Sequence, residues 1–370
     1  MRIYFIYVIT TIESDQIAYE IRAQCSKMRV EARKYGDLIR ERSYVTGWNR
    51  IDYSMLLMSC AIKGRDIGEE LRKLKETTGK KILIFYGNCQ TGTLNSLALT
   101  SKKIGDKFFI MVIPPVQNLS CNEREQGIPD EVLDNLDVLF YQHVNYANWF
   151  SKKLGTDTIL QRINRWSQVK ICIPNVYYSG TFPQMTCNRY QPTNVGDYAV
   201  GAGPFPGDGN IEKMWVNMSA KEIAEKLLDE NFYNHEEVRS KADLSMDELR
   251  KREEICDVVI SDYIQENLTQ ERLFFIPNHP RVKVILELMK RAFSKLGIDV
   301  DDVNAKEVAE PDIQVIPIYP SIRKALYLEH VDDICYEPSL PEKPSDMRQY
   351  VSAYIKYCKP LYNSEKRAQY

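Results

Sequence analysis

The chain has 370 residues, of which 44% are hydrophobic, so it can bury the core of one large domain or of two smaller ones. Its formal net charge of −2, with both signs evenly mixed, argues against a nucleic-acid partner, because such proteins usually carry a marked basic excess. Nine scattered cysteines without a CxxC pair and four histidines without an HExxH motif favour reduced thiols in a cytoplasmic protein and argue against a metal site.

The first 80 residues predict a small accessory α/β segment. The opening "MRIYFIYVITTIES" is short, contains two tyrosines and lacks a small-x-small cleavage site, so it indicates a first strand rather than a signal peptide. A charged helix over about 17–42 and a second helix over 54–63 follow. No run approaches the roughly 20 apolar residues of a membrane span, and we expect none.

From residue 81 onward, apolar runs alternate with helical segments. Strands are expected over 82–86, 108–113, 137–142, 169–173 and 273–276, because these runs are continuous, β-branched and aromatic, as in strands covered on both faces. Helices are expected over 91–101, 129–136 and 156–166. The alternation predicts an α/β core over 81–330, with a parallel sheet between two layers of helices.

The later part of the chain is rich in helix signals. Capping boxes that begin at Ser219 and Ser245 predict helices over 219–231 and 245–267, which would form a helical insertion at about 215–270. A further helix, "RVKVILELMKRAFSKLG", would end at Gly297. Because "YEPSLPEKPSDM" is polar and rich in proline, residues 331–370 are expected to form a C-terminal tail.

A cysteine stands where the first core strand meets its helix, in "KILIFYGNCQTGTLNSLALT". At a helix N-terminus, unpaired N–H groups and the macrodipole would lower the pKa of the Cys89 thiol and could receive an oxyanion. The alternative is a small side chain that only fills the turn. Its neighbours Asn88 and Gln90 are candidates for oxyanion binding or orientation.

A histidine follows another predicted strand, in "FFIPNHP". Since the carboxyl ends of parallel strands share one edge of a sheet, His279 is expected on the same side of the molecule as Cys89. A thiol and an imidazole are the minimum for an activated nucleophile. The alternative is a surface histidine between two prolines.

Polar side chains follow two more of the predicted strands. After residues 137–142, "YQHVN" supplies Gln142 and Asn145 as amide donors and His143 as a rival base, although ordinary loop polarity also explains them. After residues 169–173, a second stretch is suited to sugar or adenine stacking, and packing explains it about as well. Its candidate ligand contacts are Asn175, Tyr178, Gln184 and Arg189.

Three motifs in this order, "YGNCQ", "IPNVYYSGTFPQ" and "FFIPNHP", resemble the WcbI-type family of polysaccharide-biosynthesis acetyltransferases. The resemblance covers about residues 81–297. It implies an SGNH-hydrolase-like three-layer α/β/α fold, coenzyme A binding, and acetylation of sugars of a capsular polysaccharide. In the SGNH pattern the nucleophile corresponds to Cys89, the base to His279 and the third-block asparagine to Asn145.

Two parts of the SGNH pattern are missing here. The second-block glycine has no clear counterpart in "IPPVQN", and Ile276 stands where an aspartate is expected, three residues before His279. The most that the resemblance implies is a dyad, or a triad completed by an amide such as that of Asn278.

The sequence therefore predicts a CoA-dependent O-acyltransferase that acts on a sugar hydroxyl. Attack of Cys89 on acetyl-CoA would exchange one thioester for another, and the sugar could then take the acetyl group with His279 as base. Direct transfer, with Cys89 only shaping the pocket, stays open. The alternatives are an esterase or thioesterase of the same fold and a non-catalytic binder of coenzyme A or glycan.

Overall fold

The computed structural model describes residues 44–46, 49–119, 121–145, 152–163, 165–186, 207–310, 315–330 and 344–368. The first strand and the charged helix predicted before residue 44 lie outside these residues. The centre of the fold is a six-stranded sheet in the order β1-β2-β4-β3-β5-β6. Its strands are β1 (Val45–Thr46), β2 (Arg50–Asp52), β3 (Lys81–Tyr86), β4 (Phe108–Val112), β5 (Val138–Tyr141) and β6 (Val169–Cys172).

The five strands β2 to β6 are parallel, and only β1 runs antiparallel to its neighbour β2. In the central strand β3, Leu83 and Phe85 point into one hydrophobic cluster, whereas Ile82 and Ile84 point into the other. This alternation follows from the two-residue period of a strand. Apolar residues at every position therefore require helices on both faces, and the predicted parallel α/β fold is confirmed.

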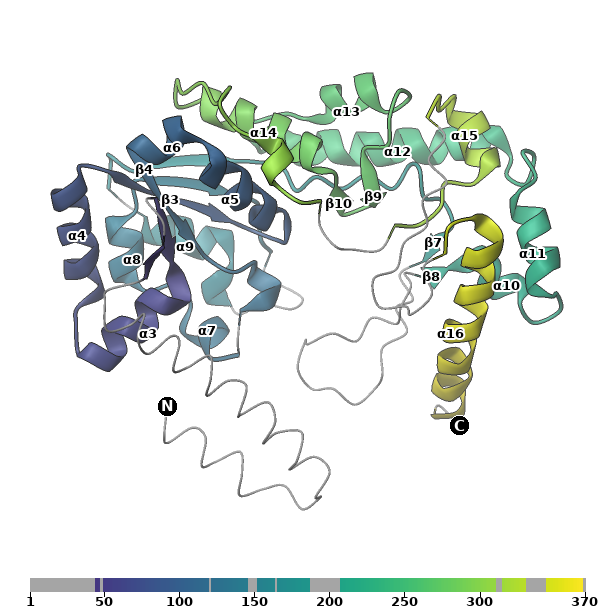
Figure 1. Ribbon diagram of the computed structural model, residues 1–370, viewed down its shortest axis with the longest axis horizontal. Coiled ribbons are helices and arrows are strands. Elements are labelled where there is room, and N and C mark those ends of the chain that lie inside the picture. Colours follow the sequence, from purple (N-terminus) through teal and green to yellow (C-terminus); the bar gives the residue numbers. More distant parts are fainter. Residues whose placement is uncertain are drawn as a thin grey trace, which may run out of the picture.

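Helices cover both faces of the sheet (Figure 1). One layer contains α5 (Gln90–Thr100), α6 (Lys102–Lys107) and α14 (Val282–Ser294). The other contains α3 (Tyr53–Lys63), α4 (Ile67–Thr78), α7 (Cys121–Gln126), α8 (Asp130–Asn135) and α9 (Thr156–Arg162), with the short helices η1 (Val116–Asn118) and η2 (Lys152–Leu154).

The described part of the first 80 residues is not set apart from the core. Strand β2 hydrogen-bonds to β4 within the main sheet, and Leu56 of α3 and Leu71 of α4 are fully buried in the cluster beneath it. Pairing with β4 gives this short strand a partner that its own sequence does not reveal. The expected accessory segment is thus, over residues 44–80, an extension of the sheet.

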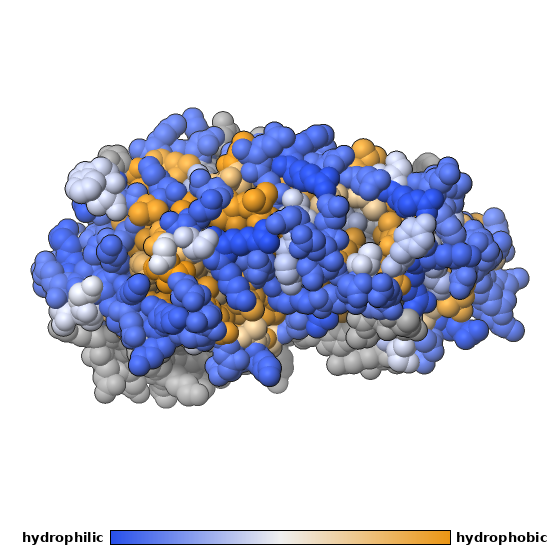
Figure 2. Space-filling view, turned by 90° about the horizontal axis from the view of Figure 1, so that it is seen from above, coloured by the Kyte–Doolittle hydropathy of each residue, from blue (hydrophilic) through white to orange (hydrophobic). Residues whose placement is uncertain are grey.

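A helical part lies beside the sheet, on the right of Figure 1. Its elements are β7 (Met185–Thr186), β8 (Gly207–Asp208), α10 (Gly209–Met214), α11 (Ala220–Leu227), α12 (His235–Glu253), α13 (Ser261–Asn267), α15 (Pro320–Leu326) and α16 (Met347–Ala368), whereas η3 (Ala305–Glu307) packs on α5 and α14. The face seen in Figure 2 is mainly hydrophilic, with hydrophobic side chains gathered over the sheet-containing half. Over the described ranges, none of the helices combines the length and the apolar character needed to cross a membrane.

Two predictions about this helical part are wrong. Ser245 does not begin a helix: it lies inside α12, which is capped at Asn234, and its hydroxyl accepts a hydrogen bond from the backbone of Ser179 at 2.8 Å. The expected C-terminal tail contains α16, in which Tyr350 and Tyr354 are buried. Their spacing of four residues places both on one face of the helix, and the proline-rich stretch before it concealed this pattern. The predicted box at Ser219, by contrast, caps α11.

The strand expected over 273–276 forms as β9 (Phe274–Ile276), but its place was predicted wrongly. It pairs antiparallel with β10 (His279–Pro280) in a separate two-stranded sheet. The buried guanidinium of Arg272 donates hydrogen bonds to the carbonyl oxygens of Phe274 at 2.9 Å and Ile316 at 2.5 Å. Part of the hydrogen-bonding capacity of β9 is thereby used by this side chain rather than by a strand of the main sheet.

Candidate active site

Cys89 lies at the turn between β3 and α5, as predicted. It occupies the N-cap position of α5 with helical backbone angles (φ −55°, ψ −24°). The side chain of Asn88 accepts a hydrogen bond from the Gln90 N–H at 2.9 Å, and the Asn88 carbonyl accepts one from the Thr91 N–H at 3.0 Å. Asn88 thus caps the first turn of the helix, which leaves the thiol of Cys89 free of that task.

His279 contacts Cys89, although His279 belongs to a different sheet from β3, the strand that precedes Cys89. The Nε2 atom of His279 lies 3.3 Å from Sγ of Cys89. The histidine begins β10, and the turn before it is tied to the segment after β6 by a hydrogen bond from the Tyr178 N–H to the Pro277 carbonyl at 2.9 Å. The expected neighbourhood is therefore found, but a hairpin that reaches across the carboxyl edge produces it rather than a common parallel sheet (Figure 1).

The environment of the Cys89 thiol corrects the expected direction of its pKa. Burial raises the pKa above its ordinary value, and the N–H groups of Cys89 and Gln90 and the side chain of Gln117 oppose this only in part. The helix start does favour the thiolate, but desolvation is the larger effect. The sulfur therefore needs a base to lose its proton near neutral pH, and an imidazole lies within reach.

Gln117 is a site residue that the sequence analysis missed. It belongs to η1, after β4, and its side chain acts to lower the pKa of the Cys89 thiol. A hydrogen bond from the Val116 N–H to the Gly87 carbonyl, at 3.0 Å, holds this loop against the nucleophile turn. Its position after the second core strand could have indicated it. That stretch, "IPPVQN", was compared only with the glycine of the SGNH pattern.

The predicted amides divide into supporting and exposed groups. Gln90 and Gln142 are buried beneath the Cys89–His279 pair and hydrogen-bond to each other. Asn175 accepts a hydrogen bond from the Asn88 side chain at 2.8 Å, and Asn278 contributes its backbone carbonyl to Gln90. Asn145 is exposed after β5.

The remaining predicted residues lie in other surroundings. Tyr178 is buried, and its ring packs 5.6 Å from that of Phe274. Gln184 is buried and donates to the Pro317 carbonyl at 2.9 Å. His143 is exposed, with Nε2 3.9 Å from Oδ1 of Asp157. Arg189 lies outside the described residues.

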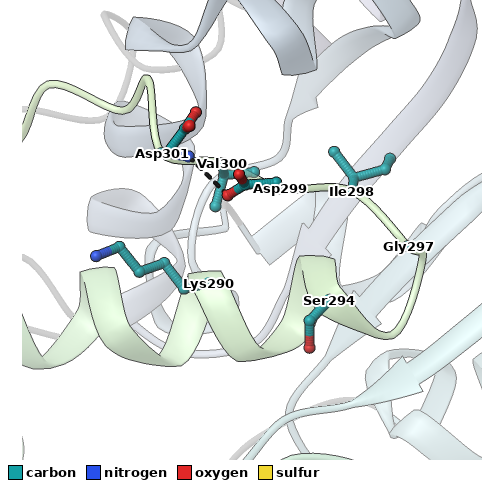
Figure 3. A pocket seen from close by; sticks show the side chains of 7 residues that line it. All are labelled: Lys290, Ser294, Gly297, Ile298, Asp299, Val300 and Asp301. Atoms are coloured by element: carbon teal, nitrogen blue, oxygen red, sulfur yellow. Dashed lines mark hydrogen bonds between the residues drawn. The ribbon is translucent and has the colours of Figure 1, made fainter.

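A hollow of about 450 Å³ opens elsewhere, at the end of α14 (Figure 3). It is lined by Lys290, Ser294, Gly297, Ile298, Asp299, Val300 and Asp301. The adjacent Asp302 hydrogen-bonds to Ser101 at the C-terminal end of α5, whereas Cys89 is at the other end, about 18 Å away along the helix at 1.5 Å per residue. In the described part of the chain, no group of three or more His, Cys, Asp and Glu side chains could hold a metal ion.

Comparison with known proteins places this site in a family. Residues 82–301, more than half of the chain, match the model of the polysaccharide biosynthesis enzyme WcbI. A solved structure of WcbI, described as a novel polysaccharide biosynthesis enzyme and as native protein without the disulfide bond between coenzyme A and a cysteine, is similar in fold. Its TM-score is 0.60 at 17% identity, over 74% of this chain and 89% of that chain. No curated protein matches. The chain belongs to the family of the polysaccharide biosynthesis enzyme WcbI.

Proposed function

We propose that the protein is a CoA-dependent O-acyltransferase that transfers an acyl group, acetyl in the simplest case, to a sugar hydroxyl during polysaccharide biosynthesis. The observation that carries this proposal is the 3.3 Å contact between Sγ of Cys89 and Nε2 of His279 at the start of α5. The description of the related WcbI structure, which is without a disulfide bond between coenzyme A and a cysteine, names CoA together with a cysteine of that protein and supports CoA as the acyl carrier here.

In the first half-reaction, Nε2 of His279 takes the proton from Cys89 as the sulfur attacks the thioester carbon of acyl-CoA. The carbon–sulfur bond to CoA then breaks, and the leaving thiolate recovers the proton from the imidazolium. One thioester replaces another, so this step is nearly balanced in free energy. A serine would form a more stable oxygen ester, from which further transfer is less downhill.

In the second half-reaction, the imidazole takes the proton of a sugar hydroxyl while its oxygen attacks the acyl carbon. The Cys89 sulfur leaves and is reprotonated by His279. The N–H groups of Cys89 and Gln90 and the side-chain amide of Gln117 favour a negative charge at the sulfur, so we assign them to the oxyanion. Asn145, exposed after β5, is the candidate third donor in an SGNH-like arrangement.

The other predicted contacts are assigned according to the exposure of their side chains. We keep Asn175 and His143 as candidate contacts to the sugar or to CoA, because their side chains are half-buried and exposed, respectively. Buried Gln142, Tyr178 and Gln184 are assigned to support of the site. We propose a sugar of a capsular or other polysaccharide as the acceptor.

The test is incubation with acetyl-CoA followed by mass spectrometry of the peptide that contains Cys89. The wild-type protein should acquire one acetyl group there and pass it to an acceptor glycan. Cys89→Ala should acquire none, and His279→Asn should be acylated far more slowly. Cys60→Ser is a suitable control, since Cys60 is a buried thiol in α3.

Two outcomes would replace the proposal. Steady, rapid release of free CoA without any acceptor would identify a thioesterase. Turnover that is unchanged in Cys89→Ala would show direct transfer, and the covalent mechanism would be wrong.

A further inference from the structure

We propose that Gln90 is a positioning residue that holds the histidine hairpin in register with the nucleophile turn. The inference rests on the proposed pairing of Cys89 with His279. Gln90 directly follows Cys89, and its side chain is 3% exposed.

All the hydrogen-bonding capacity of the Gln90 amide is used. Its Nε2 donates to the carbonyl oxygens of Val176 at 2.7 Å and Asn278 at 3.1 Å. Its Oε1 accepts from the Val176 N–H at 3.1 Å and from Nε2 of Gln142 at 2.9 Å. A carboxamide has two N–H donors and two acceptor lone pairs, so each of them has one partner.

These partners come from three separate segments at the carboxyl edge of the sheet. Gln142 follows β5, Val176 lies in the segment after β6, and Asn278 is in the turn between β9 and β10. Asn278 immediately precedes His279, just as Gln90 immediately follows Cys89. The Gln90–Asn278 hydrogen bond is therefore a second bridge between the two backbones, next to the sulfur–nitrogen contact.

The orientation of the Gln90 amide is determined by its surroundings. Val176 faces it with both a donor N–H and an acceptor carbonyl, so exchanging the nitrogen and oxygen of the amide would oppose like groups at both contacts. Gln142 is fixed in the same way, because its Oε1 accepts from the Asn88 N–H at 2.9 Å. The chain Asn88–Gln142–Gln90–Asn278 thus links the residues adjacent to Cys89 and His279.

Such a link is needed because the histidine hairpin is outside the main sheet. The hydrogen bonds of the parallel sheet fix the position of the strand before Cys89 but not that of His279. The aspartate expected three positions before His279 is also missing, because the apolar Ile276 stands there. A displacement of about 1 Å between reacting groups can reduce a rate ~100-fold. Loss of the amide donors should therefore impair the chemistry more than the binding of substrate.

The experiment compares Gln90→Met and Gln90→Glu with the same changes at Gln168. Gln168 is a matched control: it is 8% exposed, its Nε2 donates to the carbonyls of Leu133 at 2.7 Å and Leu136 at 2.8 Å, and it precedes β6 at the opposite edge of the sheet. The first readout is the pH dependence of iodoacetamide alkylation at Cys89, measured by peptide mass spectrometry. This readout does not require acyl transfer.

In the wild-type protein, alkylation should follow two ionisations, because an interacting sulfur and imidazole titrate as a pair. In Gln90→Met it should follow the single ionisation of a buried thiol, whereas the carboxyl group of Gln90→Glu adds an ionisation of its own, so that variant serves for the kcat comparison. The kcat for acyl transfer should fall ~10- to 100-fold, with the KM for acyl-CoA changed less than about twofold. The Gln168 variants should keep the wild-type profile and kcat despite a similar loss of stability.

The inference is overturned if Gln90→Met folds and retains the two-step profile, since the amide would then only fill space. If Gln90→Met fails to fold, Gln142→Met decides, because it removes the donor to Gln90 Oε1. A loss of the lower ionisation then supports the positioning role, and an intact profile refutes it. If the wild-type protein transfers no acyl group, the proposed function fails, and the alkylation profiles still test the role of Gln90.

Discussion

A Cβ atom on Gly87 would lie only 2.3 Å from Oε1 of Gln142. The backbone of the nucleophile turn thus passes so close to a buried glutamine that no side chain fits between them. This approach allows the Asn88 N–H to donate a hydrogen bond to Gln142 Oε1 at 2.9 Å. It thereby helps to fix the position of Cys89 in the turn after β3.

Replacing Gly87 with alanine should therefore displace Gln142 and disturb the turn. We expect a loss of roughly 1–3 kcal/mol in the free energy of unfolding, as for other overpacked sites, together with a loss of acyl transfer. Urea denaturation measures the first effect. Gly92→Ala in α5 is the control: a Cβ there has no atom within 4 Å, so this variant should gain up to about 1 kcal/mol from helix propensity. Equal stability of the two variants would contradict the close approach.

The contact of Gln117 with the sulfur predicts a shift in thiol reactivity. A hydrogen-bond donor favours the thiolate, so Gln117→Ala should raise the pKa of Cys89 further above its ordinary value. At pH 7 a smaller fraction of Cys89 would then be ionised, and alkylation would be slower. The rate at Cys89 as a function of pH measures this. Asn118→Ala, which alters an exposed side chain in the same loop, should leave the midpoint in place, and an unshifted midpoint in Gln117→Ala would refute the contact.

The sulfurs of Cys172 and Cys256 are 3.5 Å apart, and the Asp257 N–H donates to the Cys172 carbonyl at 2.9 Å. Diamide should therefore join them: each thiol gives up a proton, the disulfide forms, and the azo compound is reduced to a hydrazine. Hydrogen bonding from Cys256 lowers the pKa of Cys172, so Cys172 is expected to attack first. Non-reducing peptide mapping detects the bond. Cys256→Ser should abolish it and Cys60→Ser should not; random cross-linking would contradict the prediction.

A buried carboxyl group should make stability depend on pH. Burial raises the pKa of Asp208 from 3.8 to about 6, against opposing hydrogen bonds from Tyr319 and the backbone of Asn210 and Ile211. The folded form binds this proton more tightly than the unfolded form does. The proton therefore contributes fully to the free energy of unfolding below about pH 4, and this contribution is lost as the pH rises through 6. Two pKa units correspond to at most about 3 kcal/mol.

The isosteric Asp208→Asn change should remove this loss. We expect the free energy of unfolding, measured by urea denaturation, to decline less or rise more between pH 4.5 and pH 7.5 for the variant than for the wild-type protein. Asp106→Asn, at an exposed position in α6, controls for a change in net charge. Identical pH dependence of the wild-type protein and Asp208→Asn would show that the buried carboxyl titrates normally.

Local patterns in the sequence were sufficient for the elements of the core. Continuous apolar runs identified β3, β4 and β5, because a strand buried on both faces carries apolar residues at nearly every position. In the edge strand β6, only Ile171 and Cys172 are buried. The turn at Cys89 was recognisable because an apolar run ends at Gly87 and a helical pattern begins directly after it. These features depend on neighbours within a few residues.

Long-range contacts decided the rest. The sequence showed that residues 274–276 favour a strand, but only tertiary structure could decide that this strand pairs with β10 outside the main sheet. Likewise, the role of Ser245 depends on its contact with Ser179, 66 residues away. No local pattern encodes such partners.

The chemistry of the site likewise depends partly on local sequence and partly on long-range contacts. By itself, the sequence determined that a cysteine begins α5 and that a histidine follows a later strand. Only the fold decided that their reactive atoms lie 3.3 Å apart, that Gln117 approaches Cys89 from a separate segment, and that burial raises the pKa of Cys89. The reason is physical: residue type and position along the chain are local properties, whereas desolvation and hydrogen-bond geometry arise only when distant segments pack together.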